Sequence, residues 1–95
     1  MADRIIRRHL IVSGHVQGVG FRWRAAKAAQ SVGVTGWVRN DLAGTVSMEV
    51  QGTREQIDAV LAMLARQPWI RMDDINARDI PTQPGEYGFA TRDDG

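Results

Sequence analysis

The sequence predicts an α/β (α+β) fold in which two helices cover one face of a mostly antiparallel sheet. The main observation is the apolar periodicity, which alternates in the order strand, helix, strand, strand, helix, strand (βαββαβ). A second is that the two middle strands are joined by a turn too short for a parallel crossover. A third is length: because 95 residues have room for one core, we expect residues 1–95 to form a single domain.

The first part of the chain predicts a strand followed by a helix. Residues 8–13 are apolar at Leu10, Ile11 and Val12, as is typical of a central strand. Apolar residues then recur at helical spacing, and Gly33 is suited to the C-cap of that helix. The apolar positions are Phe21, Ala25, Ala28, Ala29 and Val32.

A hairpin is predicted next, with strands over residues 34–40 and 45–51 and a tight turn over residues 41–44. In its second strand Val46, Met48 and Val50 alternate with polar residues. This alternation predicts an antiparallel strand with one buried face.

A second helix follows the hairpin. Thr53 and Gln56 have the spacing of a capping box, and Pro68 ends the helix because the residue before a proline is pushed out of helical geometry. Its apolar stripe comprises Ile57, Val60, Leu61 and Leu64.

The remaining residues predict a polar strand near a sheet edge over residues 71–79 and a short last strand over residues 87–91. Residues 92–95 are expected to fray. Together the elements predict a ferredoxin-like α/β sandwich.

A glycine-rich loop over residues 14–20 is the strongest functional signal. It contains no acidic side chain and leads directly into the first helix, whose first turn carries Arg22. Glycines let consecutive N–H groups converge, and a helix N-terminus adds unpaired donors and a positive dipole. Since a cation there is unfavourable unless an anion neutralises it, the loop and Arg22 predict a site for a phosphate-sized anion.

The charge distribution agrees with an anionic ligand. Residues 5–40 contain six Lys and Arg and no Asp or Glu, although the whole chain has a net charge of +1. A basic face that is simply solvated is the alternative interpretation. The loop is neither a Walker A motif nor a dinucleotide fingerprint, because the GK[ST] ending and the second half of the required βαβ unit are missing.

Asn40, at the end of the first hairpin strand, has two interpretations. It caps the turn, as asparagine often does, or its carboxamide orients a water molecule beside the loop. The histidines His9 and His15 are expected to be surface or hydrogen-bonded core residues, with no metal site. The three tryptophans are expected to pack in the core or at its rim.

Two motifs make the chain similar to a known family. The first is Gly14-x-Val16-Gln17-Gly18-Val19-Gly20-Phe21-Arg22. The second is Gly36-Trp37-Val38-x-Asn40-x-x-x-Gly44-Thr45-Val46, followed by Gly52. In both motifs, in length and in element order, the sequence strongly resembles the acylphosphatase family.

The resemblance implies hydrolysis of acyl phosphates to a carboxylate and inorganic phosphate, by an enzyme that needs no metal or cofactor and forms no phosphoenzyme. It implies that Arg22 binds the phosphoryl oxygens and that Asn40 positions the attacking water. The backbone amides of the loop complete the phosphate cradle, from His15, Val16, Gln17, Gly18, Val19 and Gly20. His15 and Ala43 depart from the residues common in the family, which have arginine and Asp or Asn there.

Other functions are less well supported by the sequence. A sensor could bind phosphate, carbamoyl phosphate or another anion with the same loop and no turnover. A nucleic-acid partner is not expected, because the basic and aromatic strand signature of RNA-binding domains is absent. With no cysteine and no run of roughly 18 to 20 apolar residues, we expect a cytoplasmic monomer without membrane association.

Overall fold

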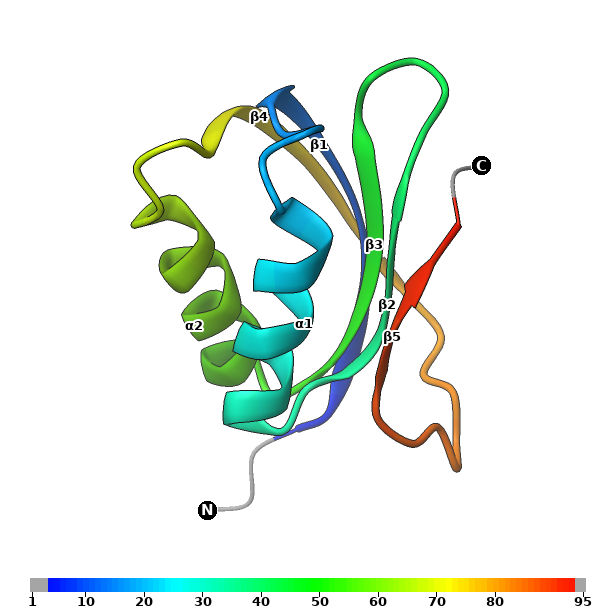
Figure 1. Cartoon of the computed structure of the whole chain (residues 1–95). Coiled ribbons are helices and arrows are strands. Elements are labelled where there is room, and N and C mark those ends of the chain that lie inside the picture. Colours follow the sequence, from blue (N-terminus) through cyan, green and yellow to red (C-terminus); the bar gives the residue numbers. More distant parts are fainter. Residues whose placement is uncertain (1–3, 94–95) are drawn as a thin grey trace.

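The computed structural model describes residues 4–93 of the chain. Its strands are β1 (Ile6–His15), β2 (Thr35–Asn40), β3 (Val46–Gly52), β4 (Arg71–Ile80) and β5 (Phe89–Arg92), and its helices are α1 (Phe21–Val32) and α2 (Arg54–Ala65). Both helices lie against the same face of the sheet, which confirms the predicted two-layer architecture (Figure 1).

The strands form one sheet in the order β4-β1-β3-β2-β5. The pairs β1/β3, β1/β4 and β2/β3 are antiparallel, whereas β5 runs parallel to β2. The sheet is therefore mixed, mostly antiparallel and ferredoxin-like, with the polar strand β4 at one edge as the sequence predicts.

The ends of β1 and β5 differ most from the prediction, whereas β2, β3 and β4 each differ by one residue at one or both ends. β1 extends from Ile6 to His15, because its start pairs with β3 and its end pairs with the first residues of β4 past a bulge at Ser13/Gly14. β5 begins at Phe89, since Tyr87 is 98% exposed and lies in the preceding loop. Arg92 belongs to β5 and is not frayed; residues 94 and 95, also expected to fray, lie outside the described residues.

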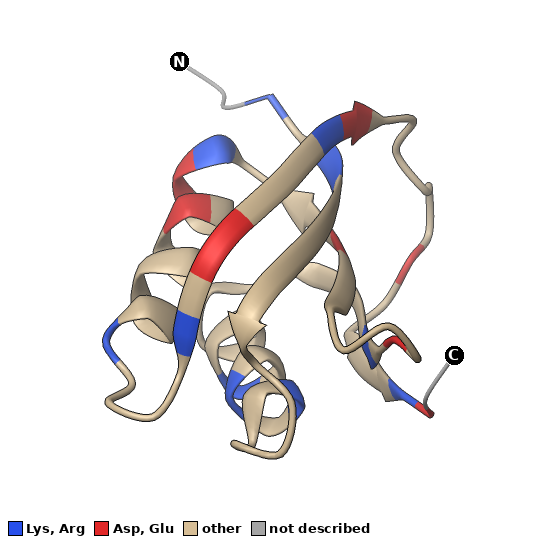
Figure 2. Cartoon of the chain, turned by 90° about the horizontal axis from the view of Figure 1, so that it is seen from above, with Lys and Arg blue, Asp and Glu red and all other residues tan. Residues whose placement is uncertain are grey.

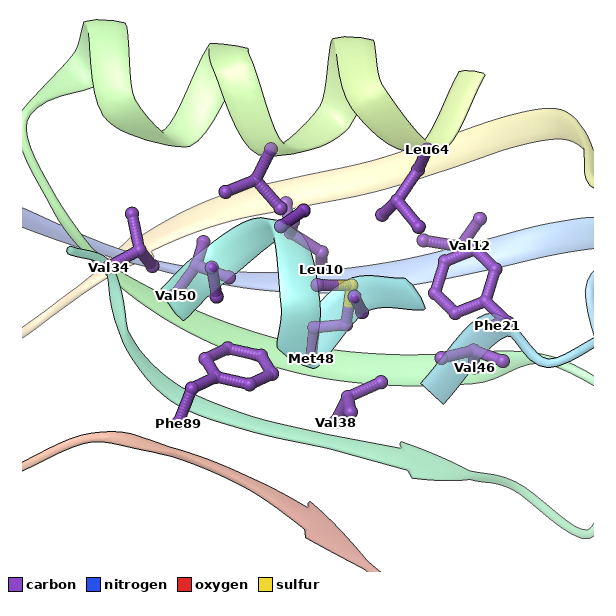
Figure 3. Close-up of a cluster of buried hydrophobic side chains, with 14 of the residues drawn as sticks. Leu10, Val12, Phe21, Val34, Val38, Val46, Met48, Val50, Leu64 and Phe89 are labelled. Carbon is purple, nitrogen blue, oxygen red and sulfur yellow. The ribbon is translucent and has the colours of Figure 1, made fainter. Parts of the chain in front are cut away.

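The core lies between the sheet and the helices (Figure 3). The alternating apolar residues of β3, together with Leu10 and Val12 of β1 and Val38 of β2, meet the stripes of both helices there. Leu61 and Val32 pack at the margin of this cluster and are only partly buried. The buried apolar side chains are Leu10, Val12, Val16, Phe21, Ala25, Ala28, Ala29, Val34, Val38, Val46, Met48, Val50, Ile57, Val60, Leu64, Ile70 and Phe89.

The predicted caps at the end of α1 and at the start of α2 are confirmed, whereas α2 ends at Ala65, three residues before Pro68. Gly33 caps α1 with φ 84°, and its N–H donates to the Ala29 carbonyl. Thr53 and Gln56 form both bonds of the capping box, at 3.1 and 2.8 Å. Each helix has 12 residues, and none in the described part of the chain is long and apolar enough to cross a membrane.

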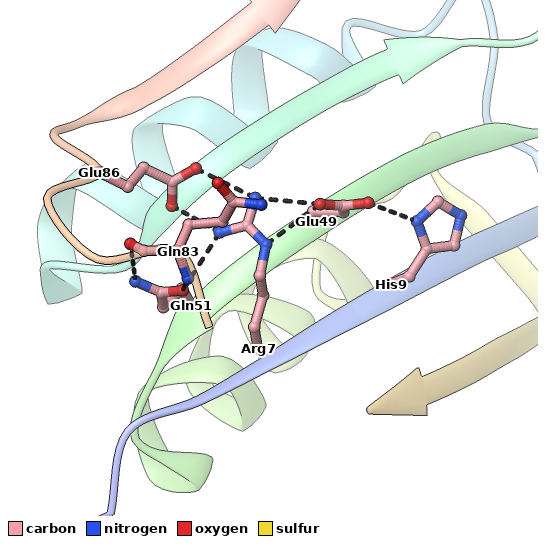
Figure 4. A network of polar contacts seen from close by, with 6 residues as sticks. All are labelled: Arg7, His9, Glu49, Gln51, Gln83 and Glu86. Atoms are coloured by element: carbon pink, nitrogen blue, oxygen red, sulfur yellow. Dashed lines mark hydrogen bonds and ion pairs between the residues drawn. The ribbon is translucent and has the colours of Figure 1, made fainter. Parts of the chain in front are cut away.

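The face of the sheet opposite the helices carries a polar network centred on Arg7 (Figure 4). The Arg7 side chain is 2% exposed and contacts the carboxylates of Glu49 and Glu86, at 3.0 and 2.7 Å. Glu49 also bonds His9 Nδ1 at 2.9 Å. Because Glu86 belongs to the segment between β4 and β5, this network fastens that segment, and hence β5, to the sheet.

Candidate active site

The glycine loop joins β1 to α1 and depends on backbone conformations that glycine favours. Gly18 and Gly20 have φ values of 73° and 76°. Gly20 is the N-cap of α1, and no side chain caps this helix. A helix N-terminus without a side-chain cap is the arrangement in which an anion can take the place of the cap.

Gly14 anchors the other end of the loop. Its φ is 130°, and a Cβ placed there would overlap the carbonyl of Arg71 on β4. The bulge at Ser13/Gly14 turns the end of β1 at this point. The close approach of two backbones fixes where the loop leaves the sheet.

Arg22 lies in the first turn of α1, next to Phe21, which is buried in the core. Its Nη1 donates to the backbone carbonyl of Arg92 at the end of β5, at 2.8 Å. The arginine at the dipole's positive end is thus held by a strand that is remote in sequence. α1 carries Arg22, Arg24 and Lys27 and no acidic residue (Figure 2). The other cations of the predicted basic segment form ion pairs instead: Arg7 with Glu49 and Glu86, Arg8 with Asp79, and Arg39 with Asp41.

Asn40 is the last residue of β2 and pairs with Val46 of β3. The turn that follows is closed by Asp41, whose carboxylate accepts hydrogen bonds from Ser47 and Thr45 at 2.7 and 2.8 Å and from Arg39 at 3.3 Å. Burial alone would raise the pKa of Asp41, but these bonds lower it below its ordinary value. The ionised carboxylate therefore stiffens the hairpin beside Asn40.

Gln17 connects the loop to this hairpin. Its Nε2 donates to the carbonyl of Asp41 at 2.7 Å and to that of Thr45 at 2.9 Å. The sequence predicted a role in phosphate binding for the backbone amide of Gln17 but none for its side chain. A local pattern gives no sign of this side-chain role, because both partners lie more than 20 positions away.

One pocket of about 450 Å³ brings the two predicted side chains together. Its lining comprises Val16, Gly18, Gly20, Phe21, Arg22, Trp23, Asn40 and Thr91. Val16, Gly18 and Gly20 of the predicted cradle are in this lining. His15, Gln17 and Val19 are not: His15 is exposed, Gln17 reaches the hairpin, and Val19 packs against the core.

Trp23 and Thr91 also line the pocket and were not singled out for it by the sequence. The prediction that the tryptophans pack in the core or at its rim is wrong for Trp23 and Trp69, because both are more than half exposed. Trp37 is buried as expected. Within residues 4–93, no group of three or more His, Asp or Glu side chains is placed to hold a metal ion.

Comparisons with known proteins show the family of the chain. The acylphosphatase family model matches residues 8–91. An acylphosphatase of Bifidobacterium longum is 40% identical over 78 residues, which cover 81% of this chain and 80% of that protein. An acylphosphatase of Bordetella parapertussis is 53% identical over 60 residues, which cover 63% of this chain and 64% of that protein.

A solved structure shares the architecture as well. The acylphosphatase of Coxiella burnetii superposes with a TM-score of 0.83 at 31% identity, over 93% of each chain. The residues that the family model matches include both motifs, the glycine loop and the hairpin that follows Asn40. The chain belongs to the acylphosphatase family and is a hydrolase of acyl phosphates.

Proposed function

We propose that Arg22 and the backbone amides of residues 15–20 hold the phosphoryl group of an acyl phosphate, and that Asn40 directs the attacking water. The observation that carries this proposal is the shared pocket, which has Arg22 and Asn40 in one lining together with Gly18 and Gly20. The guanidinium offers several N–H donors to phosphate oxygens, and the helix N-terminus adds the favourable end of its dipole.

The proposed reaction is a direct displacement at phosphorus. The water oxygen bonds to phosphorus while the bond from phosphorus to the bridging oxygen breaks, so that the electron pair leaves with the carboxylate. Because a carboxylate is a weak base and departs readily, the site needs positioning and charge stabilisation more than a strong general acid. Neither a metal ion nor a phosphoenzyme takes part in this scheme.

In this scheme the water reacts because Asn40 holds it in place, and no side chain removes its proton. The Asn40 carboxamide has one acceptor and two donor hydrogens, so it can accept from the water and donate to it or to the phosphoryl group. As an amide cannot remove a proton at neutral pH, we propose that the water proton passes to a phosphoryl oxygen of the substrate. Inorganic phosphate and the free carboxylate are then released.

The test is hydrolysis of benzoyl phosphate by the wild type, Arg22→Ala and Asn40→Ala, with and without a metal chelator. Both variants are expected to lose at least about 100-fold in kcat, as removal of one charge-stabilising group typically does. The chelator should have no effect. Arg54→Ala is the matched control, since Arg54 also lies in the first turn of a helix, α2, but is not in the pocket lining.

Wild-type turnover in either site variant, with the circular dichroism spectrum unchanged, would refute the assigned roles. Phosphate binding without any turnover by the wild type would favour a sensor. We also propose that the enzyme acts as a monomer in the cytoplasm. Light scattering after size exclusion and localisation of a tagged protein check these two points.

A further inference from the structure

Trp23 is an exposed aromatic residue at the active-site pocket. It follows Arg22 in the first turn of α1 and belongs to the same lining as Arg22 and Asn40. Its side chain is 57% exposed, although a tryptophan offers more apolar surface than other side chains. The proposed phosphate cradle makes no use of this surface.

The pocket has room for more than a phosphoryl group. At about 450 Å³ it falls within the range of roughly 300 to 1,000 Å³ typical of small-molecule sites. A phosphoryl group held by Arg22 and the loop occupies only part of that space. The acyl group is joined to phosphorus through a single oxygen, so the adjoining part of the same pocket lies within its reach.

The neighbours of Trp23 restrict its indole ring. The guanidinium of Arg24 lies 5.1 Å from the ring centroid and Lys27 Nζ lies 5.4 Å from it, both within cation–π distance. Arg24 and Lys27 line an adjacent groove beside Met63 and Leu64 of α2. Neither cation belongs to the lining of the active-site pocket, so both contact the indole ring from outside it and favour a fixed ring orientation.

The lining near Trp23 is largely apolar. Val16 and Phe21 are buried beneath the pocket, and Arg22 is the charged residue of the lining in the described part of the chain. An apolar or aromatic acyl group would bury surface against the indole ring with no unpaired polar group. A charged acyl group would have to leave water beside that ring.

We propose that Trp23 forms an acyl subsite that favours substrates with an apolar acyl group of aromatic size over small ones. The inference rests on the proposed function, because it places the phosphoryl group at Arg22. An acetyl group is too short to cover the indole ring, whereas a benzoyl group presents a flat apolar surface. Trp23 is therefore assigned a role in substrate selection and not in the chemical step.

The experiment compares kcat/KM for benzoyl phosphate and acetyl phosphate in the wild type and in Trp23→Ala. We expect Trp23→Ala to lose roughly 10-fold on benzoyl phosphate, the selectivity that one apolar pocket wall can supply. The loss of kcat/KM on acetyl phosphate should be no more than about two-fold. The inhibition constant for inorganic phosphate should not change. Trp23→Phe should recover most of the preference.

The matched control is Trp69→Ala. Trp69 is 56% exposed, close to the value for Trp23, but is not in the pocket lining. It should leave the ratio of the two kcat/KM values unchanged. An equal loss on both substrates, or no loss on either, in a folded Trp23→Ala protein overturns the acyl subsite.

The two proposals fail in different ways. If Arg22→Ala and Asn40→Ala are inactive while Trp23→Ala keeps the wild-type substrate ratio, the acyl subsite is wrong and the proposed function stands. If Arg22→Ala or Asn40→Ala keeps wild-type turnover, the proposed function is wrong, whatever Trp23→Ala does.

Discussion

The side-chain amide of Gln17 donates a 2.7 Å hydrogen bond to the backbone carbonyl of Asp41. Gln17 belongs to the glycine loop, and Asp41 directly follows Asn40 in the hairpin. The same nitrogen also donates to the carbonyl of Thr45 across the turn. The two halves of the proposed site, one for phosphate and one for water, are therefore joined by one side chain.

Replacement of Gln17 by alanine removes both bonds between the loop and the hairpin. We expect kcat for benzoyl phosphate to fall by about 10- to 100-fold, because small misplacements of a positioned water are costly to the rate. The free energy of unfolding should fall by only about 1 to 3 kcal/mol, the usual range for lost hydrogen bonds of this kind. Steady-state kinetics and urea unfolding measure the two effects.

Gln67→Ala serves as the control for that variant. Its Nε2 also donates to a backbone carbonyl, that of Met63, but within the C-terminal part of α2. It should change kcat by less than about two-fold, since it lies outside the pocket lining. A Gln17→Ala protein with wild-type kcat would show that the connection has no part in catalysis.

The network around Arg7 makes stability depend on pH in the acid range. Burial alone would raise the pKa values of Glu86 and Glu49, but hydrogen bonds from Arg7 and Thr35 to Glu86, and from His9 and Arg7 to Glu49, lower both. A carboxyl whose pKa is lower in the folded state contributes its full stabilisation above its unfolded pKa of about 4.3. That contribution is lost as the pH falls through the lower, folded pKa.

Glu86→Gln should therefore be less stable than the wild type at pH 7, by about 1 to 3 kcal/mol, because it weakens a buried ion pair. The difference should shrink as the pH falls below about 4.3, because the carboxyl is then protonated in the unfolded state before it is protonated in the folded state. Urea unfolding at pH 7 and at pH 3.5 measures it. Asp79→Asn is the control: its ion pair with Arg8 is exposed and should contribute no more than about 1 kcal/mol.

The sequence predicted the order of the elements because apolar periodicity is a local signal. Gly33, Thr53 and Gln56 act within one turn of a helix end, so their caps could also be predicted. β5 was harder, since a strand of four residues exists only through its pairing with β2. The bulge at Gly14 likewise depends on β4, more than 50 positions away.

The site also combines features that local sequence patterns predict with contacts between distant parts of the chain. Arg22 and Asn40 were expected in one site because their two motifs resemble those of the acylphosphatase family, and both line one pocket. The side-chain bonds of Gln17 and the contact of Arg22 with the Arg92 carbonyl link distant parts of the chain. Such contacts follow from the packing of β5 and the hairpin, which no local pattern encodes. The exposure of Trp23 at the pocket also depends on how distant parts of the chain pack, so no local pattern predicts it.

Gly14 and Gly44 both have positive φ values, of 130° and 95°, but differ in the space around them. A Cβ at Gly14 would meet the backbone of Arg71 and Asp73, whereas Gly44 has open space within 4 Å. Gly14→Ala should therefore destabilise the protein by more than about 3 kcal/mol, as a backbone clash adds to the strain of φ. Gly44→Ala should lose only about 1 kcal/mol.

Thermal unfolding of the two glycine variants checks this comparison. Activity should follow the same order, since Gly14 sets the point at which the loop leaves β1. Equal destabilisation by the two substitutions would mean that the positive φ alone causes the loss of stability. The backbone of β4 would then move away from the added methyl group with no loss of stability.

The final prediction concerns how Arg22 is held from β5. The carbonyl of Arg92 accepts its hydrogen bond, and the Arg92 guanidinium lies 4.4 Å from the centroid of the buried Trp37 ring. Arg92→Ala removes the cation–π contact, worth about 0.5 to 1 kcal/mol at exposed sites, and loosens the end of β5. We expect kcat/KM for benzoyl phosphate to fall several-fold, with weaker inhibition by inorganic phosphate, because Arg22 is then less well ordered.

Arg78→Ala, on the exposed edge strand β4, is the control and should leave both values unchanged. If Arg92→Ala retains wild-type phosphate inhibition, the carbonyl is positioned by the β2/β5 backbone pairing alone, and the contact with Trp37 has no part in the site.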